Sequence, residues 1–159
     1  MALRLESAAW QRRLPGVAPL VRRAARAALA AGEAKRPGKK PGDLCIVLAN
    51  DRLQRRLNHD FRGADKPTNV LSFSGAPEGL GDVVLALETV AREARAQGKS
   101  LADHVAHLVV HGVLHLMGYD HETGREAVRM ERLETRILDR LGIADPYRAV
   151  GKAKNVKQR

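Results

Sequence analysis

The chain has 159 residues, of which 44% are hydrophobic and 29% charged, and its formal net charge is +10. This length and hydrophobic content fit one domain with its own core, and no run of residues approaches the roughly twenty apolar residues of a membrane span. The amino terminus lacks the apolar run of a secretory signal, and the single Cys45, which we interpret as a core residue, excludes an internal disulfide. The composition therefore predicts a cytoplasmic protein.

The positive charge is concentrated at the two ends of the chain. Residues 1–41 carry ten Lys and Arg against two acids, residues 146–159 carry five against none, and residues 42–145 carry thirteen against sixteen. This distribution favours contact with a polyanion through the flanks and local arginines, although a solvated basic surface without a partner is the alternative. With only five aromatic residues, RNA recognition would depend on phosphate and shape more than on base stacking.

The first third of the chain predicts one strand, one helix and a second strand. Residues 2–6 have the pattern of a short strand, and residues 17–31 that of a helix with an apolar stripe. A basic loop with two prolines is expected at 33–42, and a buried strand at 44–49. These elements indicate a mixed α and β protein.

The rest of the chain alternates short strands with helices, and glycines follow the last three helices, where they permit the left-handed conformation that ends a helix. The expected elements are a helix capped by Asn50 or Asp51, strands at 70–73 and 83–87, and helices at 88–97, from Ser100 to before Gly118, and at 125–141. We expect an α+β fold, a small mixed β-sheet packed by about five helices. Residues 1–159 form a single domain in this interpretation, with a basic tail at 150–159 whose order the sequence leaves open.

Three histidines, His111, His115 and His121, have the spacing of metal ligands. Residues four apart on a helix lie about 40° apart around the axis and about 6 Å apart along it, so two imidazoles can converge on one ion. Gly118 permits the chain to turn back and bring the third histidine towards the other two. Three imidazoles without a fourth protein ligand are typical of an open, catalytic zinc site, which predicts one Zn²⁺ per chain at the end of a central helix.

Two further histidines, His104 and His107, precede the triad on the same helix. A stripe of histidines without any metal is therefore the alternative interpretation. The ordered spacing of the triad around a glycine favours the metal site. For the two earlier histidines we expect a supporting, RNA-facing or surface role.

The residue after the first histidine distinguishes this motif from that of metallopeptidases. In the HExxH pattern this residue is a glutamate that acts as general base, whereas here it is Gly112. Peptide hydrolysis would require another carboxylate, such as Glu122. The peptidase alternative is therefore disfavoured but stays open.

A second motif lies upstream, with Asn58, Arg62, Gly63 and the run from Thr68 to Phe73. With the histidine block and Gly81-Asp82, these residues make the chain closely resemble the YbeY family of bacterial endoribonucleases, from about residue 44 to 147. The resemblance implies a zinc-dependent, single-strand-selective endoribonuclease in rRNA maturation, at the 16S rRNA 3′ end, and in ribosome quality control. It also implies ribosomal RNA, the small ribosomal subunit and a ribosomal protein or assembly GTPase as partners, with no membrane and no DNA specificity.

The resemblance assigns Arg62 as the functional arginine, and we expect it to act in catalysis together with His115. A guanidinium in a turn before a strand is suited to neutralising charge on a phosphate. A ribosome-assembly factor with a structural zinc and no intrinsic cleavage is the remaining alternative. The residues expected to support a ligand or contact RNA are Asp120, His107, Arg55 and Arg56. Asp120 could equally cap the chain after Gly118, and the two arginines could equally form a solvated helix face.

Overall fold

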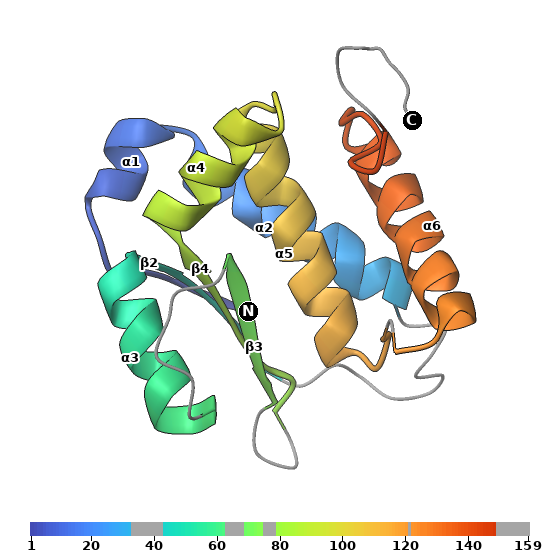
Figure 1. The fold of residues 1–159 in the computed structure, drawn as a ribbon, viewed down its shortest axis with the longest axis horizontal. Coiled ribbons are helices and arrows are strands. Elements are labelled where there is room, and N and C mark those ends of the chain that lie inside the picture. Colours follow the sequence, from blue (N-terminus) through green and yellow to red (C-terminus); the bar gives the residue numbers. More distant parts are fainter. Residues whose placement is uncertain (33–42, 63–68, 75–78, 121, 149–159) are drawn as a thin grey trace.

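A four-stranded mixed sheet forms the centre of the structure (Figure 1). The computed structural model describes all residues except 33–42, 63–68, 75–78, 121 and 149–159. The side chains of residues 60–62 and 74 also lie outside the described part. The strand order is β1-β2-β4-β3, with β1, β2 and β4 parallel and β3 antiparallel to β4. The strands are β1 (Ala2–Leu5), β2 (Leu44–Ala49), β3 (Val70–Ser74) and β4 (Gly81–Ala86).

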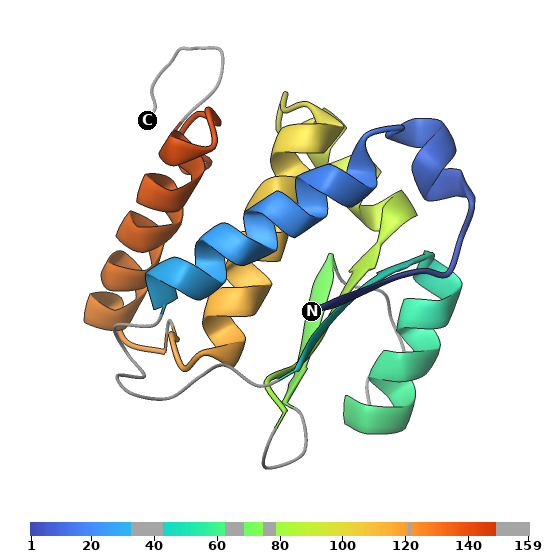
Figure 2. The same ribbon diagram turned by 180° about the vertical axis from the view of Figure 1, so that it is seen from behind.

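Helices cover both faces of this sheet. α3 lies on one face, α2, α4 and α5 lie on the other, and α6 packs on α5 and α2 away from the strands (Figures 1 and 2). None of the helices in the described part of the chain is long and apolar enough to span a bilayer. The helices are α1 (Ala9–Arg13), α2 (Val17–Gly32), α3 (Asp51–Arg62), α4 (Leu87–Ala96), α5 (Leu101–Leu116) and α6 (Gly124–Arg140).

The sheet separates a large core from a small one because successive side chains of a strand point to opposite faces. Leu44, Ile46 and Leu48 of β2 join the large core, which is filled by α2, α4, α5 and α6. Val47 and Ala49 of the same strand join the small core beneath α3. Helix α3 is therefore held to the sheet by far less apolar burial than α5.

The last three helices each end at a glycine with positive φ: Gly98 (67°), Gly118 (103°) and Gly142 (79°). At the end of α5 the Tyr119 amide donates to the Leu114 carbonyl and the Gly118 amide to the His115 carbonyl, both at 3.1 Å. This pair of hydrogen bonds is the Schellman motif, in which a left-handed residue closes the helix. The glycine stops predicted from the sequence are confirmed.

The α+β class and the small mixed sheet are also confirmed, with one helix more than expected. Helix α1 was not predicted because five residues are too short to show a helical period. It is fixed by Trp10, which is fully buried and donates its indole N–H to the Ala49 carbonyl at 2.8 Å. The predicted loop at 33–42 and tail at 150–159 lie outside the described residues.

Candidate functional site

Helix α5 brings His111 and His115 to the same side, one turn apart. Their ring centroids are 6.3 Å apart and the rings are nearly parallel, with an interplanar angle of 6°. His121 lies outside the described residues, and within the described part of the chain no group of three His, Cys, Asp or Glu side chains is arranged to hold a metal ion. The structure therefore places two members of the predicted triad together, in the last two turns of α5.

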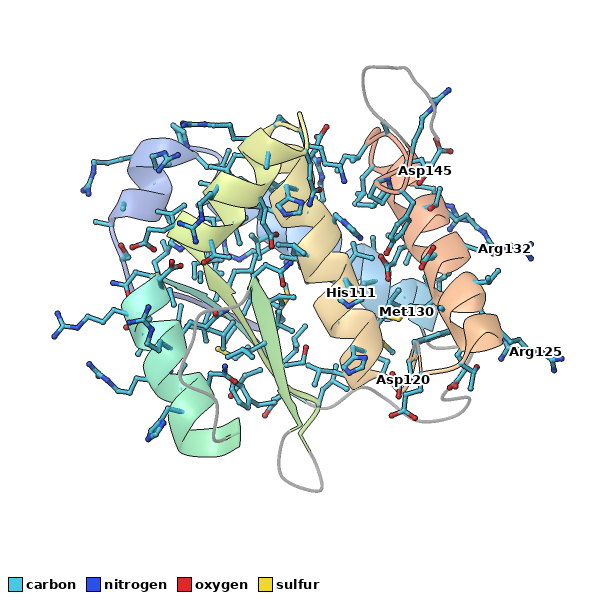
Figure 3. All side chains as sticks on the ribbon, in the orientation of Figure 1. His111, Asp120, Arg125, Met130, Arg132 and Asp145 are labelled. Carbon is cyan, nitrogen blue, oxygen red and sulfur yellow. The ribbon has the colours of Figure 1, made fainter. Side chains whose placement is uncertain are left out.

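A buried carboxylate on α6 holds one of these histidines. Glu134 is fully buried, and its Oε2 accepts a hydrogen bond from Nδ1 of His111 at 2.9 Å. Its Oε1 accepts from Nε2 of His107 at 2.7 Å and from the hydroxyl of Tyr147 at 2.5 Å. Figure 3 shows His111 on the side of α5 that faces α6, where Met130 lies opposite. One carboxylate thus connects α5, α6 and the segment after α6.

The hydrogen bonds decide the charge of this carboxylate. Burial by itself would raise the pKa of Glu134, but the hydrogen bonds from His107 and His111 outweigh it and lower the pKa from 4.5 to about 2. Glu134 is therefore ionised at neutral pH. Burial and the hydrogen bond to Glu134 raise the pKa of Tyr147, so its hydroxyl keeps the proton that it donates.

The helix turn that carries His111 lies directly against the sheet. A Cβ atom at Gly112 would lie 2.8 Å from Cγ1 of Val83, and the Ser72 hydroxyl donates to the Gly112 carbonyl at 3.3 Å. Gly112 occupies the position of the HExxH glutamate, and a side chain there would run into β4. This position therefore has no room for a general base. The contact also joins the two sequence motifs, since Ser72 belongs to the upstream block.

His104 belongs to a separate pair on the same helix. It is buried, its Nε2 lies 2.9 Å from Oε1 of Glu93 on α4, and Glu93 also accepts from the Asn69 amide at 3.0 Å. Burial lowers the pKa of His104, against the effect of Glu93. This histidine joins α4 to α5, and its ring lies edge-on to that of His107, with the centroids 6.4 Å apart.

The sequence predicted a turn at Arg62. In the structure Arg62 is instead the last residue of α3. No glycine or proline interrupts the chain between Asp51 and Arg62, so the helix continues to its end. The Arg62 side chain lies outside the described residues. The C-terminal ends of α3 and α5 lie at the same end of the molecule (Figures 1 and 2).

The remaining predicted residues lie around this end or on α3. Asp120 follows α5 and lies near the start of α6 (Figure 3). Arg55 and Arg56 are exposed on α3, on the other face of the sheet from α5. The sheet therefore lies between α3, which carries these two arginines, and α5, which carries His111.

A shallow hollow between α5 and α6 opens at His111 and continues over α6. It shares Glu131 and Tyr147 with a groove that leads to Arg132 and Arg136. Figure 3 shows Arg125 and Arg132 projecting outward from α6. The hollow itself is lined by His111, Ala127, Met130, Glu131, Glu134 and Tyr147.

Sequence reasoning missed Glu134 and Tyr147. Glu134 had one signal, since it falls on the apolar face of α6 between Met130 and Ile137, where an acid is unexpected. Tyr147 had none, because its partners come from other elements.

The sequence of this chain is similar to those of known endoribonucleases. The family model described as Endoribonuclease YbeY matches residues 14–142. The chain is 53% identical over 152 residues to Endoribonuclease YbeY of Rhodospirillum rubrum, covering 87% of this chain and 76% of that protein. It is 55% identical over 148 residues to Endoribonuclease YbeY of Alkalilimnicola ehrlichii, covering 88% and 86%.

The fold has a counterpart in the solution structure of TM1509 from Thermotoga maritima. The TM-score is 0.55 at 21% identity, and the match covers 93% of this chain and 99% of that one. This likeness shows the fold alone. The sequence matches define the class of protein as an RNA-cleaving hydrolase. The chain belongs to the YbeY endoribonuclease family, which confirms the resemblance found in the sequence.

Proposed function

We propose that this protein is a zinc-dependent endoribonuclease that cleaves single-stranded ribosomal RNA in the cytoplasm. The observation that carries the proposal is the pair His111 and His115, one turn apart on α5, with Nδ1 of His111 held by Glu134. The proposed substrate is the 3′ end of 16S rRNA, with a role in ribosome quality control. Contacts with a ribosomal protein or assembly GTPase belong to the same proposal.

The residues present fit zinc. An ionised carboxylate only accepts hydrogen bonds, so Nδ1 of His111 carries the ring proton and Nε2 keeps the lone pair that a metal ligand needs. His115 adds a second imidazole, and the turn at Gly118 leads the chain on towards His121, the third proposed ligand. When bound, zinc supplies Lewis acidity towards a phosphoryl oxygen.

The arginines of the chain supply the complementary charge. Arg62 ends α3 at the same end of the molecule as the last turn of α5, and its guanidinium is proposed to neutralise charge developing on the scissile phosphate. A groove on α6 is lined by four arginines and is proposed to follow the phosphate backbone. These arginines are Arg125, Arg129, Arg132 and Arg136.

Cleavage of a labelled single-stranded fragment from the 16S rRNA 3′ end tests the proposal. Wild type, Arg62→Ala and His115→Ala are compared, with the zinc content of each measured. We expect Arg62→Ala to retain zinc and lose cleavage, and His115→Ala to lose both. A 2′,3′-cyclic phosphate on the product would identify the RNA 2′-hydroxyl as the attacking group.

Two experimental outcomes would support a function other than RNA cleavage. Folded, zinc-loaded wild type that cleaves no RNA and unfolds on chelation would support an assembly factor with structural zinc. Chelator-sensitive cleavage of an unfolded protein would instead revive the peptidase alternative, with Glu122 as the carboxylate to test.

A further inference from the structure

Glu134 is an acidic side chain in a place where an apolar residue would be expected. It has no exposed surface and lies on the apolar face of α6 with Met130, Ile137 and Leu138. Removing a charge from water costs several kcal/mol even when partners are present, and a well-packed apolar residue is often at least as stabilising. Stability alone is therefore a weak reason for an acid at this position.

The two oxygens of Glu134 have different partners. Oε1 accepts from His107 and Tyr147, at 2.7 and 2.5 Å, whereas Oε2 accepts from Nδ1 of His111 at 2.9 Å. The first two donors fix the plane of the carboxylate, and this leaves Oε2 aimed at the His111 ring. The carboxylate is held in place before it acts on that histidine.

The ring nitrogen that faces the Glu134 carboxylate sets the tautomer of each histidine. Nε2 of His107 donates to the same carboxylate, and its Nδ1 is buried without a hydrogen-bond partner among the described residues, as suits a nitrogen that carries no proton. In His111 the arrangement is reversed, so the proton is on Nδ1 and the lone pair on Nε2. The same carboxylate thus selects opposite tautomers in two histidines one turn apart.

We propose that Glu134 is a positioning residue that holds His111 in the tautomer and orientation in which Nε2 binds zinc. This inference rests on the proposed function, in which His111 is a zinc ligand. A hydrogen bond from a carboxylate to the distal nitrogen of a ligating histidine orients the ring and raises its basicity, and its loss typically weakens metal binding 10- to 100-fold. His107 and Tyr147 act on the metal only through the carboxylate.

The chain contains its own matched control. Glu93 holds Nε2 of His104 at 2.9 Å, also as a carboxylate from a neighbouring helix acting on a histidine of α5. His104 is not a proposed ligand. Glu134→Gln and Glu93→Gln make the same chemical change at the two pairs.

Zinc affinity is measured by competition with a chromophoric chelator on the full chain, with circular dichroism to confirm folding. We expect zinc binding by Glu134→Gln to weaken about 10- to 100-fold and that by Glu93→Gln to change by less than about twofold. Wild-type affinity in folded Glu134→Gln, or an equal loss in both variants, would overturn the positioning role.

A second measurement needs no variant. The ¹⁵N shifts of the histidine rings in metal-free wild type report which nitrogen carries the proton, and we expect the Nδ1–H form at His111 and the Nε2–H form at His107. The Nε2–H form at His111 would overturn the proposal even if Glu134→Gln does not fold. Wild type with the expected tautomers but no zinc binding would instead contradict the proposed function and leave the orientation by Glu134 standing.

Discussion

Gly112 is the residue that lets α5 approach the sheet. An added Cβ would lie 2.8 Å from Cγ1 of Val83, which is β-branched, fully buried and unable to rotate away cheaply. We expect Gly112→Ala to lower the free energy of unfolding by about 1–3 kcal/mol, because overpacking exceeds the gain in helix propensity. Urea unfolding of the metal-free protein measures this effect.

Gly124→Ala is the matched control. Gly124 also lies in a helix, and a Cβ there meets no atom within 4 Å. We expect this variant to be unchanged or up to about 1 kcal/mol more stable. Equal effects of the two substitutions would show that close packing at β4 does not limit residue 112.

The two histidines of α5 were predictable because their relation is local: four residues on a helix fix the separation. Glu134 is 23 residues from His111 and 27 from His107, and Tyr147 is 40 residues from His107. Their meeting depends on how α6 packs on α5, which no local pattern contains. The acid in the apolar face of α6 was visible, but its partners were not.

At the level of elements, the turn after α5 directs the chain from His115 towards the third predicted ligand. Gly118 has φ 103°, a conformation that a residue with a side chain adopts only with strain. We expect Gly118→Ala to lower stability by about 1–2 kcal/mol and to weaken zinc binding. Gly16→Ala, in a turn with open space around the Cβ, should change neither quantity. Unaltered zinc affinity in Gly118→Ala would show that the turn does not position the third ligand.

The link between α5 and α6 should be sensitive to acid. The pKa of Glu134 is lowered from 4.5 to about 2 by folding, so the ionised group stabilises the fold above about pH 4.5 and this contribution is lost as the pH falls towards 2. A shift of this size corresponds to roughly 3 kcal/mol. Unfolding free energies of the metal-free protein at pH 5 and pH 3 should differ less in Glu134→Gln than in wild type.

Tyr147→Phe provides an intermediate case for the same measurement. It removes one hydrogen-bond donor from Glu134 and keeps the ring. We expect its loss of stability to begin at a higher pH than in wild type, because the carboxylate is less well stabilised. Identical acid profiles in all three proteins would contradict the assignment of this effect to Glu134.

Periodicity predicted the longer elements well. α2, α5 and α6 each carry an apolar stripe, and glycines or caps mark their ends. At the start of α5 the Ser100 hydroxyl accepts from the Asp103 amide. The placing of β4 between β2 and β3 could not be predicted, because strand order depends on contacts between segments far apart in the chain. The turn predicted at Arg62 was wrong, because α3 continues through that residue.

For the whole molecule, RNA binding should depend steeply on salt. Each phosphate contact in a single strand contributes about 0.7 to the slope of log K against log salt concentration. We expect replacing Arg129 and Arg132 of the α6 groove with Gln to reduce the slope by about 1.4. Filter binding of single-stranded RNA between low and moderate salt measures it.

Arg92 and Arg95, exposed on α4 and outside the basic flanks, give a control with the same change in net charge. Their replacement should leave the slope nearly unchanged. Equal effects of the two pairs would indicate attraction by the overall charge and no defined path across α6.

The unequal cores on the two faces of the sheet imply that the protein opens in parts. Helix α3 rests on a cluster whose buried apolar residues, within the described chain, are Val47, Ala49, Leu71 and Val84, whereas α5 is enclosed by the large core. Amide hydrogens of α3 should therefore exchange with solvent through a low-energy local opening, long before those of α5, in a native-state hydrogen-exchange experiment. Such an opening would detach α3 from the sheet while His111 and His115 keep their places on α5, so the two faces of the sheet would lose their helices at different free-energy costs.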